Sequence, residues 1–262
     1  MLIAVDVGNT NVTVGVLKDS LVLRSVKFPT ALLRSRNKAI AALRSRFTDI
    51  RAQEKDIEAV YACSVVPAIK KNLVSVLSCF FRKEVVVIGD GVAVPIINRY
   101  RIPSQVGQDR LVNAYAGLKM FGPGIIIVDF GKAITFDIVS KRSEYTGGLI
   151  CPGLRLMQEA LHKKTALLPY VELSKPIETI GRDTVSSIRA GIVYGAAGMC
   201  DLIIKRLLAK DCKGFKVITT GGDAELIRPY SSHLSVIEEF LTLKGLGLIF
   251  KSQGSTLNMH RA

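Results

Sequence analysis

Two segments of the sequence combine an aspartate, a glycine turn and a following run of β-branched residues. The first is DVGNTNVTVGVL, from Asp6 to Leu17, and the second is DFGKAITFDIV, from Asp129 to Val139. In each segment the aspartate stands near the end of an apolar strand, and a glycine follows two positions later. A glycine there lets the backbone approach an anion closely, because no Cβ intervenes. The pattern predicts two phosphate-binding hairpins, one in each half of the chain.

The first hairpin carries the groups that a phosphate and its metal ion need. Its turn side chains and backbone N–H groups can donate hydrogen bonds to phosphate oxygens. Asp6 can hold Mg²⁺, directly or through water, because this hard cation prefers oxygen ligands. An Asp-x-Gly-Asn string is also an ordinary turn, but two copies favour a nucleotide site. The predicted phosphate loop comprises Asp6, Val7, Gly8, Asn9, Thr10, Asn11, Val12 and Thr13.

A third glycine turn lies in VITTGGD, from Val217 to Asp223. A strand that delivers Gly221 and Gly222 to the start of a helix offers an unhindered surface for an adenine and its ribose. Gly-Gly alone is a common turn. In order after two phosphate hairpins, it completes a predicted nucleotide site.

The elements that would position these residues alternate between strand and helix. Strands are expected at 2–7, 12–17, 58–66, 84–89, 124–131, 133–140 and 216–220, and a further short strand after the KRSE turn. Helices are expected at 34–47, 68–81, 107–121, 153–165, 184–208 and from 224 onward, with a frayed tail from 252. Because the second hairpin begins near the middle of the 262 residues, the pattern predicts an α/β fold of two duplicated lobes. Their predicted limits are 1–115 and 116–262, with a nucleotide cleft between them.

Composition and charge narrow the class of partner. Hydrophobic residues make up 48% of the chain, and the net charge of +14 suits anionic ligands. The densest basic cluster is Arg34, Arg36, Lys38, Arg44, Arg46 and Arg51. It shares its segment with Leu33, Ile40, Leu43, Phe47 and Ile50 at near-helical spacing. We interpret the charges as the solvent face of an amphipathic helix. Neither a nucleic-acid partner nor a membrane is expected, because aromatics do not interleave the charges and no apolar run approaches about 20 residues.

The cysteines and histidines indicate a cellular compartment and do not indicate a functional site. The five cysteines are scattered and form no CxxC pair, which disfavours a disulfide framework or a zinc site and favours core positions in a reducing cytoplasm. The N-terminus lacks a basic leader, so no signal peptide is expected. His162, His233 and His260 match no motif and are expected to be structural or surface residues.

The collinear order of motifs resembles the type III pantothenate kinases of the actin-like ATPase superfamily. The motifs are DVGNTN, GQDR, DFGKAITFD, GGLICPG, TALLP, GRDT, RAGIVYG, TTGGDA and LTLKGL, between Leu2 and Phe250. The resemblance implies two actin-like (ribonuclease H-like) lobes and ATP-dependent phosphorylation of pantothenate to 4′-phosphopantothenate, the first step of coenzyme A biosynthesis. It also implies Mg²⁺, a K⁺ or NH₄⁺ ion, and a homodimer with substrate sites near its interface.

The resemblance assigns the substrate roles to one short motif. Gly107, Gln108, Asp109 and Arg110 match the family's Gly-x-Asp-Arg, in which the aspartate is the catalytic base and the arginine grips the carboxylate of pantothenate. A carboxylate can accept the proton of a primary alcohol as it attacks the γ-phosphate. A guanidinium can bind a carboxylate in bidentate fashion. Read alone, Asp109-Arg110 favours a capped helix start with a surface charge, and the surrounding motifs reverse that preference.

Four further residues take roles from the resemblance. Asp129 matches the ligand of the monovalent cation, and the first hairpin matches the ATP phosphate loop. Thr184 matches a residue that closes the pantothenate pocket from the partner subunit. Tyr100 resembles a substrate-side aromatic, with packing as the alternative. Lys132 stands where the family has threonine, and its ammonium could act as a tethered NH₄⁺ or could point to solvent and pair with an acid. The loop before Gly107, YRIPSQV, also departs from the family, which commonly has an asparagine and a glutamate there.

Two competing functions remain open at this point. One is a nucleotide-binding regulatory protein of the same family with little kinase activity, which the basic charge and the family's association with a transcription accessory factor allow. The other is a kinase of the superfamily for a different small alcohol. Asp109 beside Arg110 discriminates against the regulatory alternative, because a pure binder needs no base. The small residues Gly191, Gly195, Ala196, Ala197 and Gly198 of the helix 184–208 could serve a dimer contact or an internal one.

Overall fold

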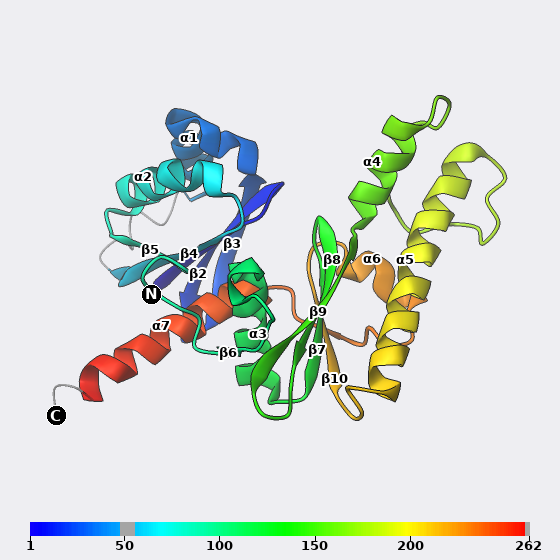
Figure 1. Cartoon of the computed structure of the whole chain (residues 1–262). Helices are drawn as coiled ribbons and strands as arrows, with labels where there is room; N and C mark the ends of the chain where they lie inside the picture. The colour runs from blue at the N-terminus through cyan, green and yellow to red at the C-terminus, as the bar shows by residue number, and fades with distance from the viewer. Residues whose placement is uncertain (48–55, 260–262) are drawn as a thin grey trace. The chain divides into compact units, whose positions relative to one another are not determined.

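The computed structural model describes residues 1–47 and 56–259, with side chains to Gln253. The chain forms two compact units (Figure 1). Unit 1 contains residues 1–120 and 240–262, and unit 2 contains residues 121–239. This division differs from the predicted limits of 1–115 and 116–262, because the C-terminal segment belongs with the N-terminal one.

Unit 1 is built on a mixed sheet with the strand order β3-β2-β1-β4-β5. Strands β1 to β3 form an antiparallel meander, and β4 and β5 continue from β1 in parallel. The strands are β1 (Leu2–Val7), β2 (Asn11–Lys18), β3 (Leu21–Pro29), β4 (Ala59–Ser64) and β5 (Val85–Val87). The helices are η1 (Thr30–Arg34), α1 (Arg36–Arg46), η3 (Pro67–Ile69), α2 (Lys70–Phe81), α3 (Gln108–Phe121) and α7 (Leu241–Met259). A short strand β6 (Ile97–Asn98) and a turn η4 (Pro103–Gln105) lie before α3.

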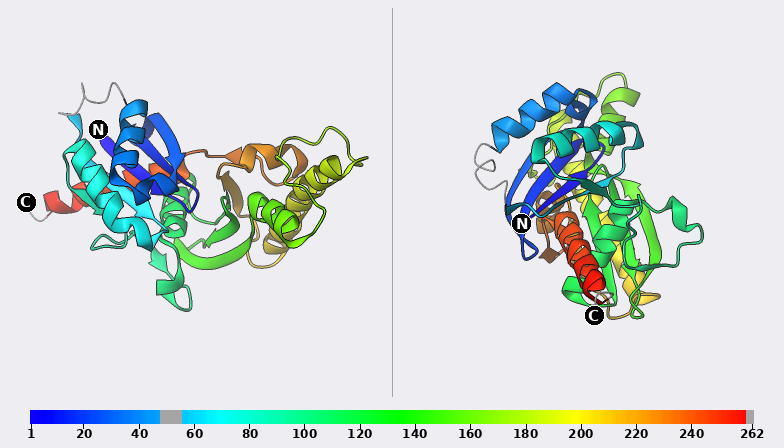
Figure 2. Two further views of the ribbon diagram at one scale, coloured as in Figure 1. Left: turned by 90° about the horizontal axis from the view of Figure 1, so that it is seen from above. Right: turned by 90° about the vertical axis from the view of Figure 1, so that its left-hand side faces the viewer.

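The alternation of side chains along β1 decides what covers each face of this sheet. Ile3, Val5 and Val7 are buried in the core beneath α1 and α2. Residues Leu2, Ala4 and Asp6 therefore point to the opposite face, where α7 packs (Figure 2). Asp6 is thus brought to the α7 side of the sheet by the same periodicity that buries its neighbours.

Helix α7 packs against the sheet and α3 at glycine positions. A Cβ on Gly15 would lie 2.8 Å from Cδ1 of Leu243, and one on Gly245 would lie 2.7 Å from Cγ1 of Val112. Two polar contacts add to this packing. The Tyr61 hydroxyl donates to Oε1 of Gln253 at 2.5 Å, and Thr242 Oγ1 donates to Oδ1 of Asn113 at 2.8 Å. The expectation of a frayed tail from residue 252 is wrong for the backbone, since α7 continues to Met259.

Unit 2 repeats the sheet of unit 1. The strands that unit 2 contributes to its sheet have the order β11-β10-β7-β8-β9, in which β7 to β9 form the antiparallel meander and β10 and β11 continue from β7 in parallel. The strands are β7 (Ile125–Phe130), β8 (Ala133–Val139), β9 (Glu144–Pro152), β10 (Lys216–Thr220) and β11 (Val236–Ile237). The predicted duplication is therefore confirmed at the level of topology.

One face of this second sheet packs against helices to form the core of unit 2. The helices are α4 (Leu154–Lys164), α5 (Thr184–Ala209), α6 (Ala224–Ile227) and η5 (Arg228–Tyr230). Ile126, Val128 and Phe130 of β7 lie in this core. By the same alternation as in unit 1, Asp129 points to the other face. The two hairpin aspartates thus occupy corresponding places in the two units.

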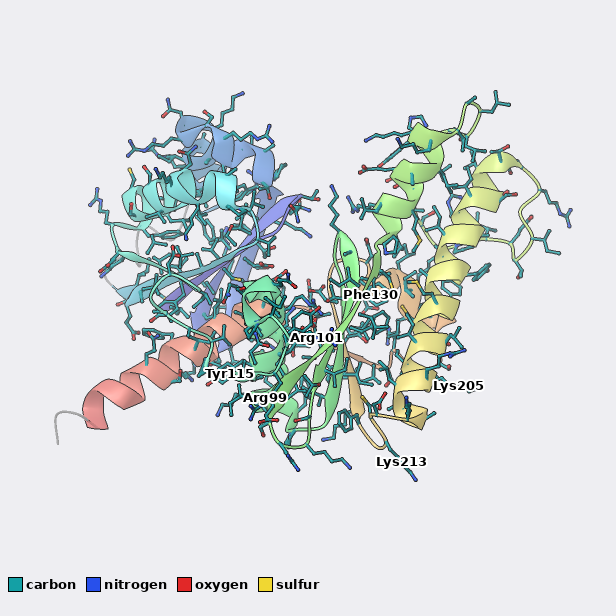
Figure 3. The ribbon with its side chains drawn as sticks, in the orientation of Figure 1. Arg99, Arg101, Tyr115, Phe130, Lys205 and Lys213 are labelled. Carbon is teal, nitrogen blue, oxygen red and sulfur yellow. The ribbon has the colours of Figure 1, made fainter. Side chains whose placement is uncertain are left out.

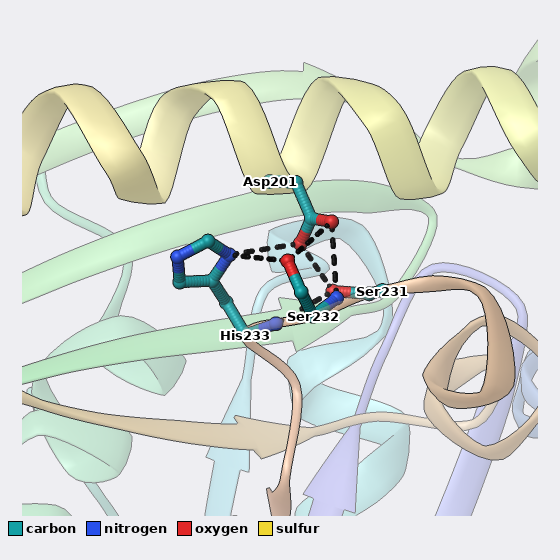
Figure 4. Close-up of polar contacts among 4 residues, drawn as sticks. All are labelled: Asp201, Ser231, Ser232 and His233. Carbon is teal, nitrogen blue, oxygen red and sulfur yellow. Dashed lines mark hydrogen bonds and ion pairs between the residues drawn. The ribbon is translucent and has the colours of Figure 1, made fainter.

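A cluster of polar contacts ties the segment after η5 to helix α5 (Figure 4). The carboxylate of Asp201 accepts hydrogen bonds from Ser231 Oγ at 2.5 Å, Ser232 N at 3.0 Å and Ser232 Oγ at 2.9 Å, and His233 Nδ1 lies 3.1 Å away. Partial burial raises the pKa of Asp201, but these hydrogen bonds outweigh it and lower the pKa to about 2. Since the folded pKa lies below the ordinary 3.8, the contribution to stability is present above that pH and is lost as the pH falls towards 2.

Most predicted elements are confirmed, and the exceptions have local causes. Strand β3 and helix α7 were not expected, and the helix expected from 224 is a short α6 followed by η5. The amphipathic interpretation holds for the described part of its segment: Leu33, Leu43 and Phe47 are buried, and the basic side chains up to Arg46 are exposed. Ile50, Arg51 and His260 lie outside the described residues. The expectation that every cysteine is a core residue is wrong for Cys79, which is exposed on α2. Within the described residues, no helix is both long and apolar enough to cross a membrane.

Candidate active site

The turn of the first hairpin is fixed by one hydrogen bond within the turn and by two from Thr30. Gly8 N donates to the carbonyl of Asn11 at 3.0 Å. Thr30, which follows β3, donates its hydroxyl to the Gly8 carbonyl at 2.7 Å and its N–H to the Thr10 carbonyl at 2.9 Å. Asn9 and Thr10 remain exposed at the tip. The loop is therefore fixed on its carbonyl side while its donor side chains face solvent.

Asp6 and Asp109 lie close enough to influence each other, although they are far apart in sequence. Burial and then the negative charge of Asp109 raise the pKa of Asp6, Lys27 lowers it, and together they bring the pKa to about 7. Cys63 lies directly opposite Asp6 on β4. Burial, and then the charges of Asp6 and Asp109, raise the pKa of its thiol well above the ordinary value.

Two neighbouring carboxylates that repel each other suit a divalent cation. A metal ion bound there would remove the repulsion between Asp6 and Asp109, and both supply hard oxygen ligands. Within the described residues, no group of three or more His, Cys, Asp or Glu side chains is arranged to hold a metal ion. Mg²⁺ commonly takes only one or two protein carboxylates and completes its shell with water and substrate phosphates. The donor set fits Mg²⁺ in this way.

The start of α3 fixes Asp109. Arg110 N donates to Oδ1 of Asp109 at 2.8 Å and also lies 3.1 Å from the Gly107 carbonyl, which begins the helix. A Cβ on Gly107 would collide with Oδ1 of Asp109, so a larger residue there would displace this carboxylate. The N-terminal turn of a helix favours a carboxylate. Arg110 follows as a buried side chain, 8% exposed.

In unit 2 the Gly221 turn packs directly on Asp129. Gly221 has φ +96°, and a Cβ there would lie 2.5 Å from Asp129 Oδ1 and 2.5 Å from Phe130 N. Thr220 is the register partner of Asp129 in the parallel pair β10–β7. Figure 3 shows Phe130 in the ribbon of this sheet. The second hairpin and the predicted adenine-side turn of Gly221 and Gly222 therefore form one site at the end of β7.

The second hairpin turn is braced by the segment that enters α4. Gly153 N donates to the Lys132 carbonyl at 3.1 Å, and a Cβ on Gly153 would collide with the carbonyls of Gly131 and Lys132. The Lys132 side chain is exposed and makes no ion pair with any described residue. The alternative that Lys132 pairs with a nearby acid has no support from these contacts.

Sequence reasoning missed three residues beside Asp129. Thr135 is the register partner of Asp129 across the hairpin, and its hydroxyl donates to Oδ2 of Asp137 at 3.0 Å. Oδ1 of Asp137 accepts the Tyr145 hydroxyl at 2.9 Å, and both Asp137 and Tyr145 are fully buried. The acid in DFGKAITFD was visible in the sequence, but its partner Tyr145 depends on the pairing of β8 with β9.

Tyr100 and Thr184 lie on separate units. Tyr100 is half-buried in the segment before α3, between the exposed Arg99 and Arg101 (Figure 3). Its N–H donates to Oδ1 of Asn98 at 2.9 Å. Thr184 begins α5 immediately after the capping residue Asp183 and lines a cavity of about 970 Å³. The other predicted site residues do not line this cavity.

The cavity beside Thr184 is lined mainly by apolar side chains from α4 and the start of α5. They include Met157, Leu161, Leu168, Ile188 and Ile192. Large apolar side chains also protrude from the connecting segment: Leu167 is 91% exposed, Ile177 is 93% exposed and Ile180 is 77% exposed. Exposed apolar surface of this extent next to a groove is typical of an interaction site.

The protein has the fold of the actin-like ATPases. MreB 5 of Spiroplasma citri bound to AMPPNP matches with a TM-score of 0.55 at 11% identity, over 99% of this chain and 98% of that chain. The activator of the 2-hydroxyisocaproyl-CoA dehydratase from Clostridium difficile with bound ADPNP matches with a TM-score of 0.58 at 11% identity, over 98% and 97%. At such identities the likeness shows the fold alone, and it confirms the predicted fold class.

Sequence comparison narrows this class to one family. The model of the type III pantothenate kinase family matches residues 2–206. A type III pantothenate kinase of Myxococcus xanthus is 40% identical over 250 residues, which are 95% of this chain and 98% of the relative. One of Halalkalibacterium halodurans is 36% identical over 251 residues, 96% and 99% of the two chains. The chain belongs to the type III pantothenate kinase family.

The Gly221 turn yields a test of the unit 2 site. Gly221→Ala is expected to lower the melting temperature and to weaken binding of an ATP analogue, because the new Cβ would meet Asp129 and Phe130. Gly214→Ala is the matched control: Gly214 also has a positive φ, +76°, but nothing lies within 4 Å of its Cβ position. The control should show only the backbone cost, about 1 kcal/mol. Equal effects of the two substitutions on nucleotide binding would contradict the assignment.

Proposed function

We propose that this protein transfers the γ-phosphoryl group of ATP to the primary alcohol of pantothenate, giving 4′-phosphopantothenate for coenzyme A biosynthesis. The observation that carries the proposal is that Asp6, at the end of β1, and Asp109, in the first turn of α3, lie near each other in unit 1. This arrangement brings the hairpin proposed to bind metal and phosphate and the candidate base together in unit 1. The chain that contains them belongs to the type III pantothenate kinase family. The regulatory alternative gains nothing from the relatives, which bear the name of the kinase.

Each step of the transfer has a residue to perform it. The hairpin from Asp6 to Thr13 would hold the phosphates, with Mg²⁺ at Asp6 neutralising their charge. Asp109 would accept the proton of the alcohol as its oxygen attacks the γ-phosphorus. Buried Arg110 would bind the carboxylate of pantothenate and so orient the alcohol, since a charge-assisted pair is strongest where water is excluded.

The remaining predicted residues would complete the two ligand sites. Gly221 and Gly222 would receive the adenine and ribose, because a turn without side chains leaves room for a flat ring. Asp129 would hold the monovalent cation. Tyr100 would form a wall of the pantothenate site. The proposal extends to a reducing cytoplasm, which suits five unpaired thiols.

We further propose a homodimer formed through the α4–α5 region of unit 2. Gly191, Gly195 and Gly198 lie on an exposed face of α5 with nothing within 4 Å of their Cβ positions, whereas Ala196 and Ala197 are buried in the core. The exposed apolar side chains and the apolar cavity belong to the same region. A surface that carries both protrusions and a groove is self-complementary, as a two-fold interface requires. Thr184 would then act in the pantothenate site of the partner subunit.

The base assignment predicts a loss of turnover without a loss of folding. Asp109→Asn should lower pantothenate-dependent ADP formation by about 10²–10⁴, the usual worth of a positioned general base. ATP binding and the melting temperature should change little, because the amide keeps the shape of the side chain. Asp19→Asn removes an exposed carboxylate of the same unit and should be neutral. Near wild-type turnover in Asp109→Asn would show that another group takes the proton. An unmutated protein that binds ATP but makes no ADP with pantothenate would refute the kinase function itself.

The dimer predicts that one exposed apolar residue controls both assembly and activity. Ile180→Glu should convert the dimer to a 28.5 kDa species in sedimentation at micromolar concentration and should lower turnover, because Thr184 would no longer reach the partner's site. Leu21→Glu places the same charge at another exposed apolar position, 65% exposed on β3, and should leave both properties unchanged. A fully active monomer in the unmutated protein would contradict the dimer.

The proposed role of Lys132 predicts that turnover depends little on added K⁺. Its ammonium, three positions beyond Asp129, can take the place of a bound K⁺ or NH₄⁺ near the transferring phosphoryl group. Turnover in sodium-only buffer should therefore approach that in potassium buffer, and Lys132→Thr should make turnover depend on K⁺. Lys141→Thr, on the exposed turn after β8, should leave the salt response unchanged. Strong K⁺ activation of the unmutated protein would show that Lys132 does not replace the ion.

A further inference from the structure

A buried carboxylate lies behind the Asp129 site and has no role in the transfer described above. Asp137 has no exposed surface, and each of its oxygens accepts a hydroxyl: Oδ1 from Tyr145 at 2.9 Å and Oδ2 from Thr135 at 3.0 Å. A carboxylate buried in this way loses its hydration, and the loss is offset only where donors replace the water. The three side chains therefore form a fixed polar unit within the sheet.

The direction of the Thr135 hydrogen bond limits what its hydroxyl can do. A hydroxyl has one proton to donate and two lone pairs that accept. Because the Thr135 proton is given to Asp137, only lone pairs remain for any other neighbour. Thr135 can thus meet a cation or a donor, but it cannot donate to a phosphate oxygen.

The register of the hairpin brings this acceptor beside Asp129. Asp129 and Thr135 are directly opposite each other in the antiparallel pair β7–β8. Side chains at such positions lie on the same face with Cβ atoms about 4.5–5.5 Å apart. The Asp129 carboxylate is also confined by the close approach of Gly221. A carboxylate oxygen and a hydroxyl lone pair are therefore adjacent, which is the oxygen donor set that a hard monovalent cation takes.

The first hairpin provides an internal comparison. There Asp6 faces Thr13 in the same way, but the residue two positions beyond Thr13 is Gly15, where the second hairpin has Asp137. No carboxylate of that strand claims the Thr13 proton, so Thr13 can donate to a phosphate. The two copies of one hairpin thus differ at the single position that decides whether the threonine donates or accepts.

We propose that Thr135 is an oxygen ligand of the monovalent cation together with Asp129, and that Asp137 is the positioning residue that keeps the Thr135 proton away from that cation. The inference rests on the cation site of the proposed function. The same oxygens suit K⁺, NH₄⁺ or the ammonium of Lys132, since all three are monovalent cations met by lone pairs.

The test measures ion binding by thermal stability rather than by activity. Lys132→Thr is the background, because a lysine ammonium would compete with the ion. In this protein K⁺ should raise the melting temperature above that in equal Na⁺ by about 3 °C at tenfold the half-saturating concentration. Adding Thr135→Val should abolish the K⁺-specific shift, whereas adding Thr135→Ser, which keeps the hydroxyl, should preserve it. Thr146→Val is the matched control, since it removes an exposed threonine hydroxyl from β9 of the same sheet.

Asp137→Asn separates the positioning role from mere support of the fold. An amide at this place can donate to Thr135 and turn its proton outward, so the K⁺ concentration for half the thermal shift should rise at least about tenfold. A purely structural role would lower the melting temperature in both salts without changing that concentration. If Thr135→Val keeps the shift with the same half-saturating concentration, or if the background protein shows no K⁺-specific shift, the inference is overturned. Either outcome leaves the kinase reaction standing, because pantothenate-dependent ADP formation is measured separately.

Discussion

A carboxylate at the end of a buried strand is unfavourable unless something positive or protic meets it, and both units of this protein are organised around that constraint. In unit 1 the half-buried Asp6 side chain lies near a second acid, and its raised pKa reflects the cost of ionising it there. In unit 2 two hydroxyl donors satisfy Asp137 completely, while the neighbouring Asp129 lies against a glycine turn. In the proposed function the first arrangement would bind a divalent cation and phosphates, and the second a single positive charge. Both would place positive charge where negative charge develops on the phosphoryl oxygens.

Duplication followed by local divergence explains how one fold supplies both environments. The two sheets share their strand order and their hairpins place an aspartate opposite a threonine in each unit. The differences are small in sequence and large in chemistry. Gly15 leaves room for Leu243 of α7, whereas its counterpart Asp137 fills the same place in unit 2 with a charge. The two hairpins keep the same strand pairing, and they differ in whether a carboxyl group accepts the proton of the threonine.

The sequence was sufficient for features that depend on neighbours in the chain. The hairpins, the start of α3 at Gly107 and the Gly221 turn follow from local patterns of glycine, acid and β-branched residues. It was not sufficient for contacts between distant segments. Thr30 holds the phosphate loop from 22 positions away, and nothing in its own surroundings indicates this. Tyr145 reaches Asp137 only because β8 and β9 pair with a shift in register. Gly245 and Gly247 could have indicated a closely packed helix, but only the folded structure identifies what approaches them.

The position of α7 also determines the order in which the protein can be completed during synthesis. Unit 2 is continuous, so all of its residues are synthesised before α7 is translated. Unit 1 is completed later, because Tyr61, Gly15 and Val112 are covered by α7, which follows unit 2 in the sequence. Until then one face of its sheet stays open to solvent, with apolar residues on a surface that nascent chains must protect from aggregation. Unit 1 is therefore begun before unit 2 and completed only when α7 packs against it.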